Sequence, residues 1–250
     1  MSTPCLLSPI FKAFAKSFCL AGILCFCAPV HAGPINLDLV NTGIRVDATG
    51  VDQRYHLTLS ADPANPGPRA FAVQLLPPTG GSFGWMPNQP TSRWIAPPLD
   101  ESWGPDRPIG NQSAGTYIYE TRFTIPNDAD LSTARITGQL AVDNQLTGII
   151  LNGNRFDITT PLRGLNPENL GFSQFRPFSL TSSFVLGENV LDFVVENLFD
   201  TNGPNPTGIQ IQLEGTVNTA PEPGTLALAG MGIVGTLGFW LKKRQRQGLE

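Results

Sequence analysis

Residues 117–125 read Tyr-Ile-Tyr-Glu-Thr-Arg-Phe-Thr-Ile, a stretch rich in β-branched and aromatic side chains that largely alternates apolar with polar residues. Residues 134–142 and 189–196 have the same character. Successive side chains of an extended strand point to opposite faces, so this alternation predicts strands with one face in a core and the other in water.

Period-two patterns continue through the second half of the chain. Turn signals separate the apolar stretches, and we find no convincing helical period between them. Short strands joined by turns predict an all-β fold, an antiparallel sandwich. The strands expected here are 178–186 and 208–217, and the turn signals are Asn152-Gly153, Asn202-Gly203 and Gly187.

Two regions lack any regular period. Residues 75–109 hold eight prolines and three of the four tryptophans, and we expect an extended excursion across the sandwich that its aromatic side chains order. Trp94 lies in a strand-like run and is expected in the core. Residues 157–177 are expected to form a long loop between strands.

The first 32 residues have the pattern of a secretory signal peptide. Lys12 and Lys16 form the basic region, 17–27 the apolar region, and Val30-His31-Ala32 the cleavage site. All four cysteines lie in this segment, so the processed chain is expected to form no disulfide.

The last thirty residues combine a spacer, an apolar span and a basic cluster. An uncharged span at 224–241 covers about 27 Å as a helix, enough for a single transmembrane crossing. The basic residues after it are expected to stay in the cytoplasm. The spacer is Pro221, Glu222 and Pro223, and the basic cluster is Lys242, Lys243 and Arg244, with Arg246 behind it.

This order resembles the PEP-CTERM sorting signal over residues 218–250. The resemblance implies that an exosortase-type enzyme at the inner membrane cuts at Pro-Glu-Pro, after which the protein is released or transferred to the cell surface or the extracellular space. The alternative is an ordinary single-pass anchor that keeps the protein on the inner membrane, facing the periplasm.

Between the two terminal segments, residues 33–217 resemble the galactose-binding-like domain. The resemblance implies one antiparallel jelly-roll β-sandwich of eight or nine strands, flanked by the signal peptide and the transmembrane helix. It is carried by Ser92-Arg93-Trp94-Ile95, 115–121, 136–144, Ile150-Leu151-Asn152-Gly153, 189–197 and Pro206-Thr207-Gly208-Ile209.

The charge balance of the expected mature part differs from that of the whole chain. Six of the 16 basic residues and two of the 20 acidic ones lie in the terminal segments, which leaves 10 arginines, no lysine and 18 acidic residues, near −8. A domain this acidic is poorly suited to a phosphate backbone, so nucleic acid is not expected as a partner.

No catalytic site is expected. Residues 80–84 match Gly-x-Ser-x-Gly around Ser82, but prolines stand where the strand and helix of a nucleophile elbow belong, and His56 precedes the serine. Paired carboxylates of a glycan-active enzyme stay open as an alternative, although Glu120, Glu196 and Glu214 lie in strand-like runs where charge normally faces solvent.

We expect the chain to require no cofactor. A structural calcium ion is nevertheless possible by resemblance, because jelly-roll domains of this family often carry one. Calcium takes oxygen ligands from carboxylates, amides and backbone carbonyls. The candidate ligands are Asp128, Asp130, Asp143 and Asn144, of which the first two also fit a plain turn.

Sugar binding needs an exposed aromatic face flanked by planar polar groups. The candidates in the two irregular regions are Trp85, Trp103, Phe172, Phe175 and Arg176. The alternative is that these aromatics plug the ends of the sandwich. We therefore expect an exported cell-surface or extracellular-matrix protein that binds exopolysaccharide without catalysis; a structural matrix protein making protein–protein contacts is the second hypothesis.

Overall fold

The computed structural model describes residues 33–74, 84–98, 100, 111–156, 171–199 and 205–219. These residues form an all-β, antiparallel structure without a helix. Within them, no helix has the length and apolar character to cross a membrane. The predicted signal peptide and transmembrane span lie outside the described residues. Gly33–Ala220 forms one compact unit.

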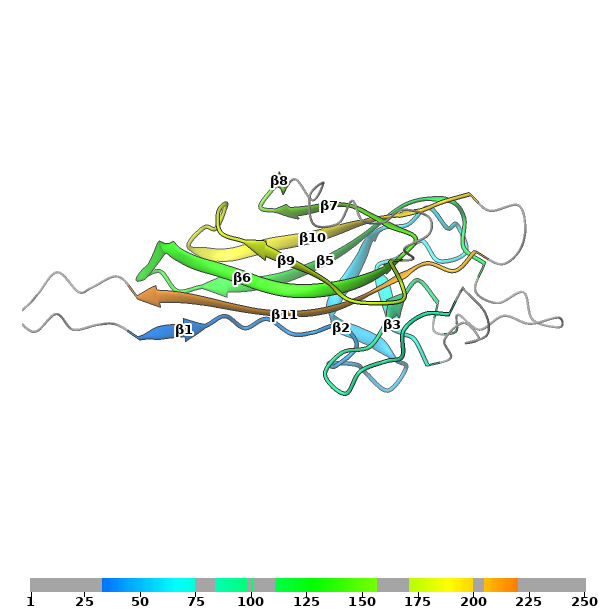
Figure 1. Ribbon diagram of the computed structural model, residues 1–250, viewed down its shortest axis with the longest axis horizontal. Helices are drawn as coiled ribbons and strands as arrows, with labels where there is room; N and C mark the ends of the chain where they lie inside the picture. Colours follow the sequence, from blue (N-terminus) through cyan, green and yellow to red (C-terminus); the bar gives the residue numbers. More distant parts are fainter. Residues whose placement is uncertain are drawn as a thin grey trace, which may run out of the picture. The chain divides into compact units, whose positions relative to one another are not determined.

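Eleven strands make up the described part, and three of them have only two or three residues (Figure 1). The jelly-roll resemblance implied eight or nine, and the short strands account for the difference. The strands are β1 (Pro34–Asn36), β2 (Val51–Leu59), β3 (Arg69–Ala72), β4 (Ile95–Ala96), β5 (Gly115–Ile125), β6 (Ala129–Asp143), β7 (Gln145–Leu151), β8 (Asn154–Phe156), β9 (Arg176–Leu180), β10 (Gly187–Asn197) and β11 (Gly208–Thr219).

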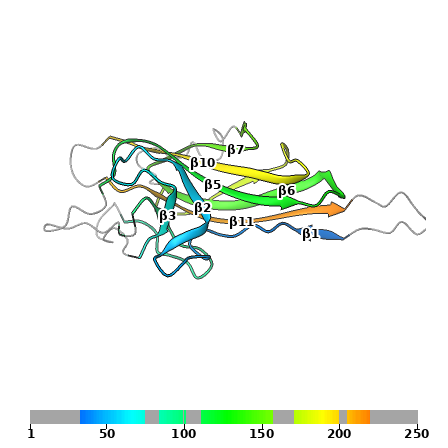
Figure 2. The same ribbon diagram turned by 180° about the vertical axis from the view of Figure 1, so that it is seen from behind.

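The strands follow one hydrogen-bonded path in the order β8-β7-β10-β5-β2-β3-β4-β11-β6-β9, and β1 pairs with β11 off this path. The long pairings are β5 with β10 and β6 with β11, each with eleven residue pairs, all antiparallel. Figures 1 and 2 show these long strands running side by side along the molecule.

The path curls so that its two halves face each other across one core. Phe178 of β9 packs edge-on against Phe193 of β10 with ring centroids 5.9 Å apart, although β9 and β10 stand far apart on the path. Alternate residues of β5, such as Tyr119, point into this core and are fully buried. The result is a sandwich or near-barrel. The period-two pattern of the sequence indicates which residues of its strands face the core.

The two ends of the sandwich differ. At the terminal end, defined by Pro34, Ile125, Gly187 and Thr219, β1 lies antiparallel to the last residues of β11, with Pro34 opposite Asn218. At the loop end, defined by Gly115, Asp143, Asn197 and Gly208, β6 and β10 finish and β5 and β11 begin. The chain therefore enters β1 and completes β11 at the same end of the sandwich.

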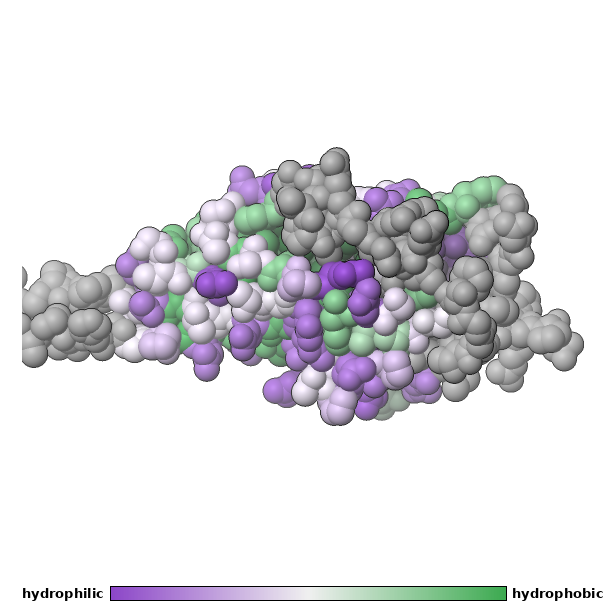
Figure 3. Space-filling model, in the orientation of Figure 1, coloured by the Kyte–Doolittle hydropathy of each residue, from purple (hydrophilic) through white to green (hydrophobic). Residues whose placement is uncertain are grey.

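Hydrophilic side chains are spread over the described part of the face drawn in Figure 3, with small apolar groups between them. This mixture agrees with the alternation along the strands, because their polar residues face outward. Among the described large hydrophobic side chains, Phe199 has the largest exposed fraction, at 80%.

Most of the strands predicted from alternation are confirmed, since residues 117–125, 134–142, 189–196 and 208–217 lie in β5, β6, β10 and β11. The strand predicted at 178–186 is wrong beyond residue 180, where β9 ends. Ser183 has a positive φ of 68°, which breaks an extended chain, and the Asn189 side chain holds the segment as a loop.

Asn189 is fully buried and connects two loops at the terminal end. Its Nδ2 donates to the backbone oxygens of Val185 (2.8 Å) and Gly187 (3.0 Å). Its Oδ1 accepts from the Val185 N–H (3.0 Å) and from Asn152 Nδ2 (2.8 Å). Asn152 and Gly153 have φ values of 52° and 79°, which confirms the tight turn predicted for Asn-Gly.

We expect Asn189→Ala to lower the free energy of unfolding by about 3 kcal/mol, because it leaves several buried backbone and amide groups without partners. The measurement is chemical denaturation followed by circular dichroism. Asn127→Ala, in an exposed turn, is the matched control and should change stability by less than about 0.5 kcal/mol. Equal effects of the two variants would contradict the role assigned to Asn189.

Candidate functional site

A second, smaller core brings the two irregular regions together near the loop end. Trp85 and Trp94 stack with ring centroids 4.2 Å apart and planes inclined by 29°. Phe172 is buried with them, and Met86 and Phe175 pack against the cluster as partly buried residues. The backbone N–H of Met86 donates to the Phe172 oxygen at 2.7 Å. The aromatic ordering predicted for the first region is therefore present in residues 84–98.

Trp94 is fully buried, which confirms its prediction as a core residue. Its indole Nε1 donates to the Met86 backbone oxygen at 2.8 Å, and its backbone N–H donates to Asn88 Oδ1 at 2.8 Å. Both N–H groups of this tryptophan are thus satisfied without water, as burial requires.

Trp85 lies against the first residue of β11. A Cβ added at Gly208 would stand 2.8 Å from Trp85 Cη2 and 2.9 Å from the Ile95 backbone oxygen. The absence of a side chain at Gly208 therefore lets the indole reach the sheet.

Asp143, the last residue of β6, is the ionisable group of this cluster. Its Oδ2 accepts a 2.7 Å hydrogen bond from Trp85 Nε1, while its Oδ1 has no partner within the described part of the chain. The residue is only 3% exposed. Burial raises the pKa of this carboxyl to about 7, and the hydrogen bond from Trp85 opposes part of that increase.

Buried side-chain hydrogen bonds close the loop end beside Asp143. Thr207 Oγ1 donates to the Asp143 backbone oxygen at 2.6 Å, and the Thr207 N–H donates to Gln112 Oε1 at 3.2 Å. Asn197 Nδ2 donates to the Gln112 backbone oxygen at 3.2 Å. This network joins three segments distant in sequence, and nothing in their local patterns reveals it.

The predicted sugar-binding residues are partly brought together. Trp85, Phe172 and Phe175 belong to one cluster, but the first two are 1% and 6% exposed, so their rings face neighbouring side chains. Arg176 begins β9 and is partly buried. Trp103 lies outside the described residues. In this structure Trp85 and Phe172 are packing residues, and the cluster offers no open ring from either of them.

The predicted calcium ligands do not form one site. Asp128 and Asp130 lie where β6 begins, and Asp143 and Asn144 where it ends, about 40 Å away along an extended strand. Within the described ranges no three His, Cys, Asp or Glu residues are grouped to hold a metal ion. Asn144 Oδ1 accepts the Leu198 N–H at 2.8 Å. These residues do not fit a shared calcium ion.

The residues considered for catalysis do not gather at one place: His56 lies opposite Glu120 in the β2–β5 pair, whereas Glu196 lies on β10 and Glu214 on β11. His56 faces solvent on β2, and Ser82 lies outside the described residues. Glu120 Oε1 accepts from Arg122 Nε at 2.7 Å, and Glu196 Oε2 accepts from Thr116 Oγ1 at 2.8 Å.

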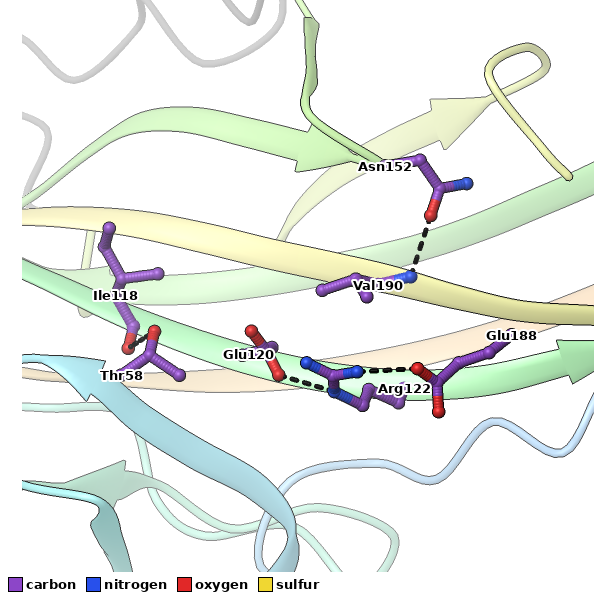
Figure 4. A network of polar contacts seen from close by, with 7 residues as sticks. All are labelled: Thr58, Ile118, Glu120, Arg122, Asn152, Glu188 and Val190. Atoms are coloured by element: carbon purple, nitrogen blue, oxygen red, sulfur yellow. Dashed lines mark hydrogen bonds and ion pairs between the residues drawn. The ribbon is translucent and has the colours of Figure 1, made fainter.

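The sequence reasoning missed a charged network on the outer face of β5 and β10. Arg122 Nη1 donates to Glu188 Oε1 at 2.6 Å while its Nε binds Glu120, so one guanidinium joins two strands (Figure 4). Next to it, burial and the Glu120 charge raise the pKa of Asp192. The sequence could have indicated this network, because the polar positions of the alternating pattern face outward. They place Glu120, Arg122, Glu188 and Asp192 on one face of the sheet.

Residues 219–244 match the PEP-CTERM protein-sorting motif. No curated protein shows significant similarity to the chain. The motif begins at Thr219, the last residue of β11, so the sorting signal follows the sandwich directly. The chain therefore carries a PEP-CTERM sorting motif, which indicates export and processing by an exosortase at the membrane.

Asp143 should make stability depend on pH. Its folded-state pKa lies above the unfolded value of 3.8, so the folded protein keeps a proton that the unfolded chain loses. The free energy of unfolding should therefore fall between pH 4 and pH 7 by up to about 4 kcal/mol and then level off.

Asp143→Asn keeps an oxygen acceptor for Trp85 but does not titrate, so it should reduce that fall; Asp52 and Asp192, whose pKa values burial also raises, keep the remainder. Denaturation curves at several pH values measure the effect. Asp128→Asn, at an exposed turn, should keep the pH slope of the unmodified protein. An unchanged slope in Asp143→Asn would mean that the carboxyl is not the titrating group.

Proposed function

We propose that this chain is an exported cell-surface or extracellular-matrix protein that binds exopolysaccharide and catalyses no reaction. The observation that carries the proposal is the direct junction between β11 and the PEP-CTERM motif at Thr219. In this proposal residues 1–32 are a signal peptide, and 224–241 span the inner membrane until an exosortase cuts at Pro221-Glu222-Pro223.

The strand arrangement supports a display role. The motif continues from the terminal end, and the twelve residues of β11 place the loop end about 40 Å further along the strands. The loop end carries the aromatic cluster and several long connections. A protein held through its tail would present that end, together with the outer sheet faces, to the surrounding polysaccharide.

The pairing pattern supports a galactose-binding-like jelly roll for residues 33–217. The strand pairs are nested along the chain, because β7–β8 lies inside β6–β9, which lies inside β5–β10. Such wrapping of one long strand pair around another is the arrangement of a jelly roll. The fold hosts many functions, so the ligand is argued from surface chemistry.

Two carboxylates that accept hydrogen bonds from neighbouring side chains support a role without catalysis. Glu120 is bound to Arg122 and Glu196 to Thr116, so both stabilise the surface of the sheet. His56 stands on β2 opposite Glu120 of β5, in the register of the strand pair.

Exposed apolar residues favour a structural matrix protein as the second candidate. Leu198 and Phe199 follow β10 at the loop end and are 50% and 80% exposed. Adjacent exposed apolar side chains are suited to contact with another protein.

Processing of the tail is the first test. Protein recovered from outside the inner membrane should lack the peptide 226–242, since cleavage at Pro-Glu-Pro removes it. Mass spectrometry of the recovered protein measures this. Intact exported protein that retains the peptide would contradict processing at this site.

Binding of the chain to glycans is the second test. The full chain, kept soluble in a detergent without a sugar headgroup, should bind saturably to the exopolysaccharide of its own cells or to members of a glycan panel. Titrations with calcium and with chelator should give the same affinity, because the predicted calcium ligands lie at opposite ends of β6. Absence of binding in both conditions would favour the structural role.

A further inference from the structure

A pocket of about 230 Å³ opens where β2 separates from β5. The register of the two strands runs from Ile118 to Thr121 of β5 and stops there, so the next residues of β5 have no partner strand on that side within the described part of the chain. The lining residues are Asp38, Arg54, Arg122, Phe123, Thr124 and Glu188.

Ion pairs hold both arginines of the pocket. Arg54 Nη2 donates to Asp38 Oδ2 at 3.1 Å and to the Asp38 backbone oxygen at 2.6 Å. Arg122 is held by Glu120 and Glu188 at 2.7 and 2.6 Å (Figure 4). These contacts engage Nε and Nη1 of Arg122, which leaves its Nη2 amino group without a hydrogen bond in the described structure.

The chemistry of the lining selects an uncharged ligand rich in hydroxyl groups. Two arginines and two carboxylates give the lining no net formal charge, so a free anion or cation would meet repulsion as well as attraction. A sugar hydroxyl both donates and accepts, and it can bind guanidinium donors, carboxylate acceptors and the Thr124 hydroxyl together. The volume is below the range of drug-sized sites and suits one sugar ring.

We propose that this pocket binds one hexose unit of a neutral glycan chain. The inference rests on the proposed polysaccharide-binding function and moves its site from the loop aromatics to the outer sheet face. There hydrogen bonds replace the aromatic stacking expected from the sequence, because the one aromatic lining residue, Phe123, is only 3% exposed. Arg122 donates to ring hydroxyls, and Glu188 and Asp38 accept from them.

The test uses the full chain in a detergent without a sugar headgroup and titrates it with neutral hexasaccharides of glucose, galactose and mannose and with hexasaccharides that carry uronic acids. Arg122→Gln removes the charged donor, so the association constant of the tightest ligand should fall by about tenfold or more. Glu188→Gln should also weaken binding. Arg135→Gln, an exposed β6 residue outside the lining, is the matched control and should bind as the unmodified protein does.

The outcomes separate the pocket from the general function. If the unmodified chain binds and Arg122→Gln binds equally well, the pocket assignment is wrong while polysaccharide binding stands. If the unmodified chain binds no glycan, both fail. If it binds only hexasaccharides that carry uronic acids, the assignment to neutral glycans is overturned. Thermal unfolding of each variant checks that it still folds. We expect folded variants, because partly exposed ion pairs contribute little to the free energy of unfolding.

Discussion

The fold depends on the burial of alternate side chains along four long strands. In the β5–β10 pair, eleven residue pairs keep the inward residues of both strands on one face, opposite those of β6 and β11. A shift by one residue would turn every buried side chain toward water, so burial of the core fixes the register. The network formed by Asn189 and the close approach of Trp85 to Gly208 both require this register.

Sequence periodicity predicted β5, β6, β10, β11, part of β9 and the turn at Asn152-Gly153, because these features are local. It also separated the regular strands from the two irregular regions. The hydrogen bond between Trp85 and Asp143 could not be predicted, since the two residues are 58 positions apart and meet only when the excursion folds over β6. The end of β9 was missed because the Asn189 side chain, on the next strand, decides the backbone of residues 183–187.

The outer face follows from the same alternation as the core. Each strand that sends one side chain inward sends the next outward, so Glu120, Arg122, Glu188 and Asp192 gather on one surface as a by-product of packing. The departure of β2 from β5 after Thr121 then opens space beside them. Sequence indicates which residues face outward, but the place where two strands part depends on the curvature of the whole sandwich, which local patterns do not encode.

The pairing of β1 with the end of β11 also determines how the domain responds to mechanical force. A pull between the two neighbouring termini would peel β1 from β11 one hydrogen bond at a time. A pull between the last residue of β11 and the opposite end of the sandwich instead runs along β11, whose bonds to β6 lie perpendicular to the strand. Those bonds would be loaded together in shear, so the domain resists tension along β11 far better than separation of its two ends.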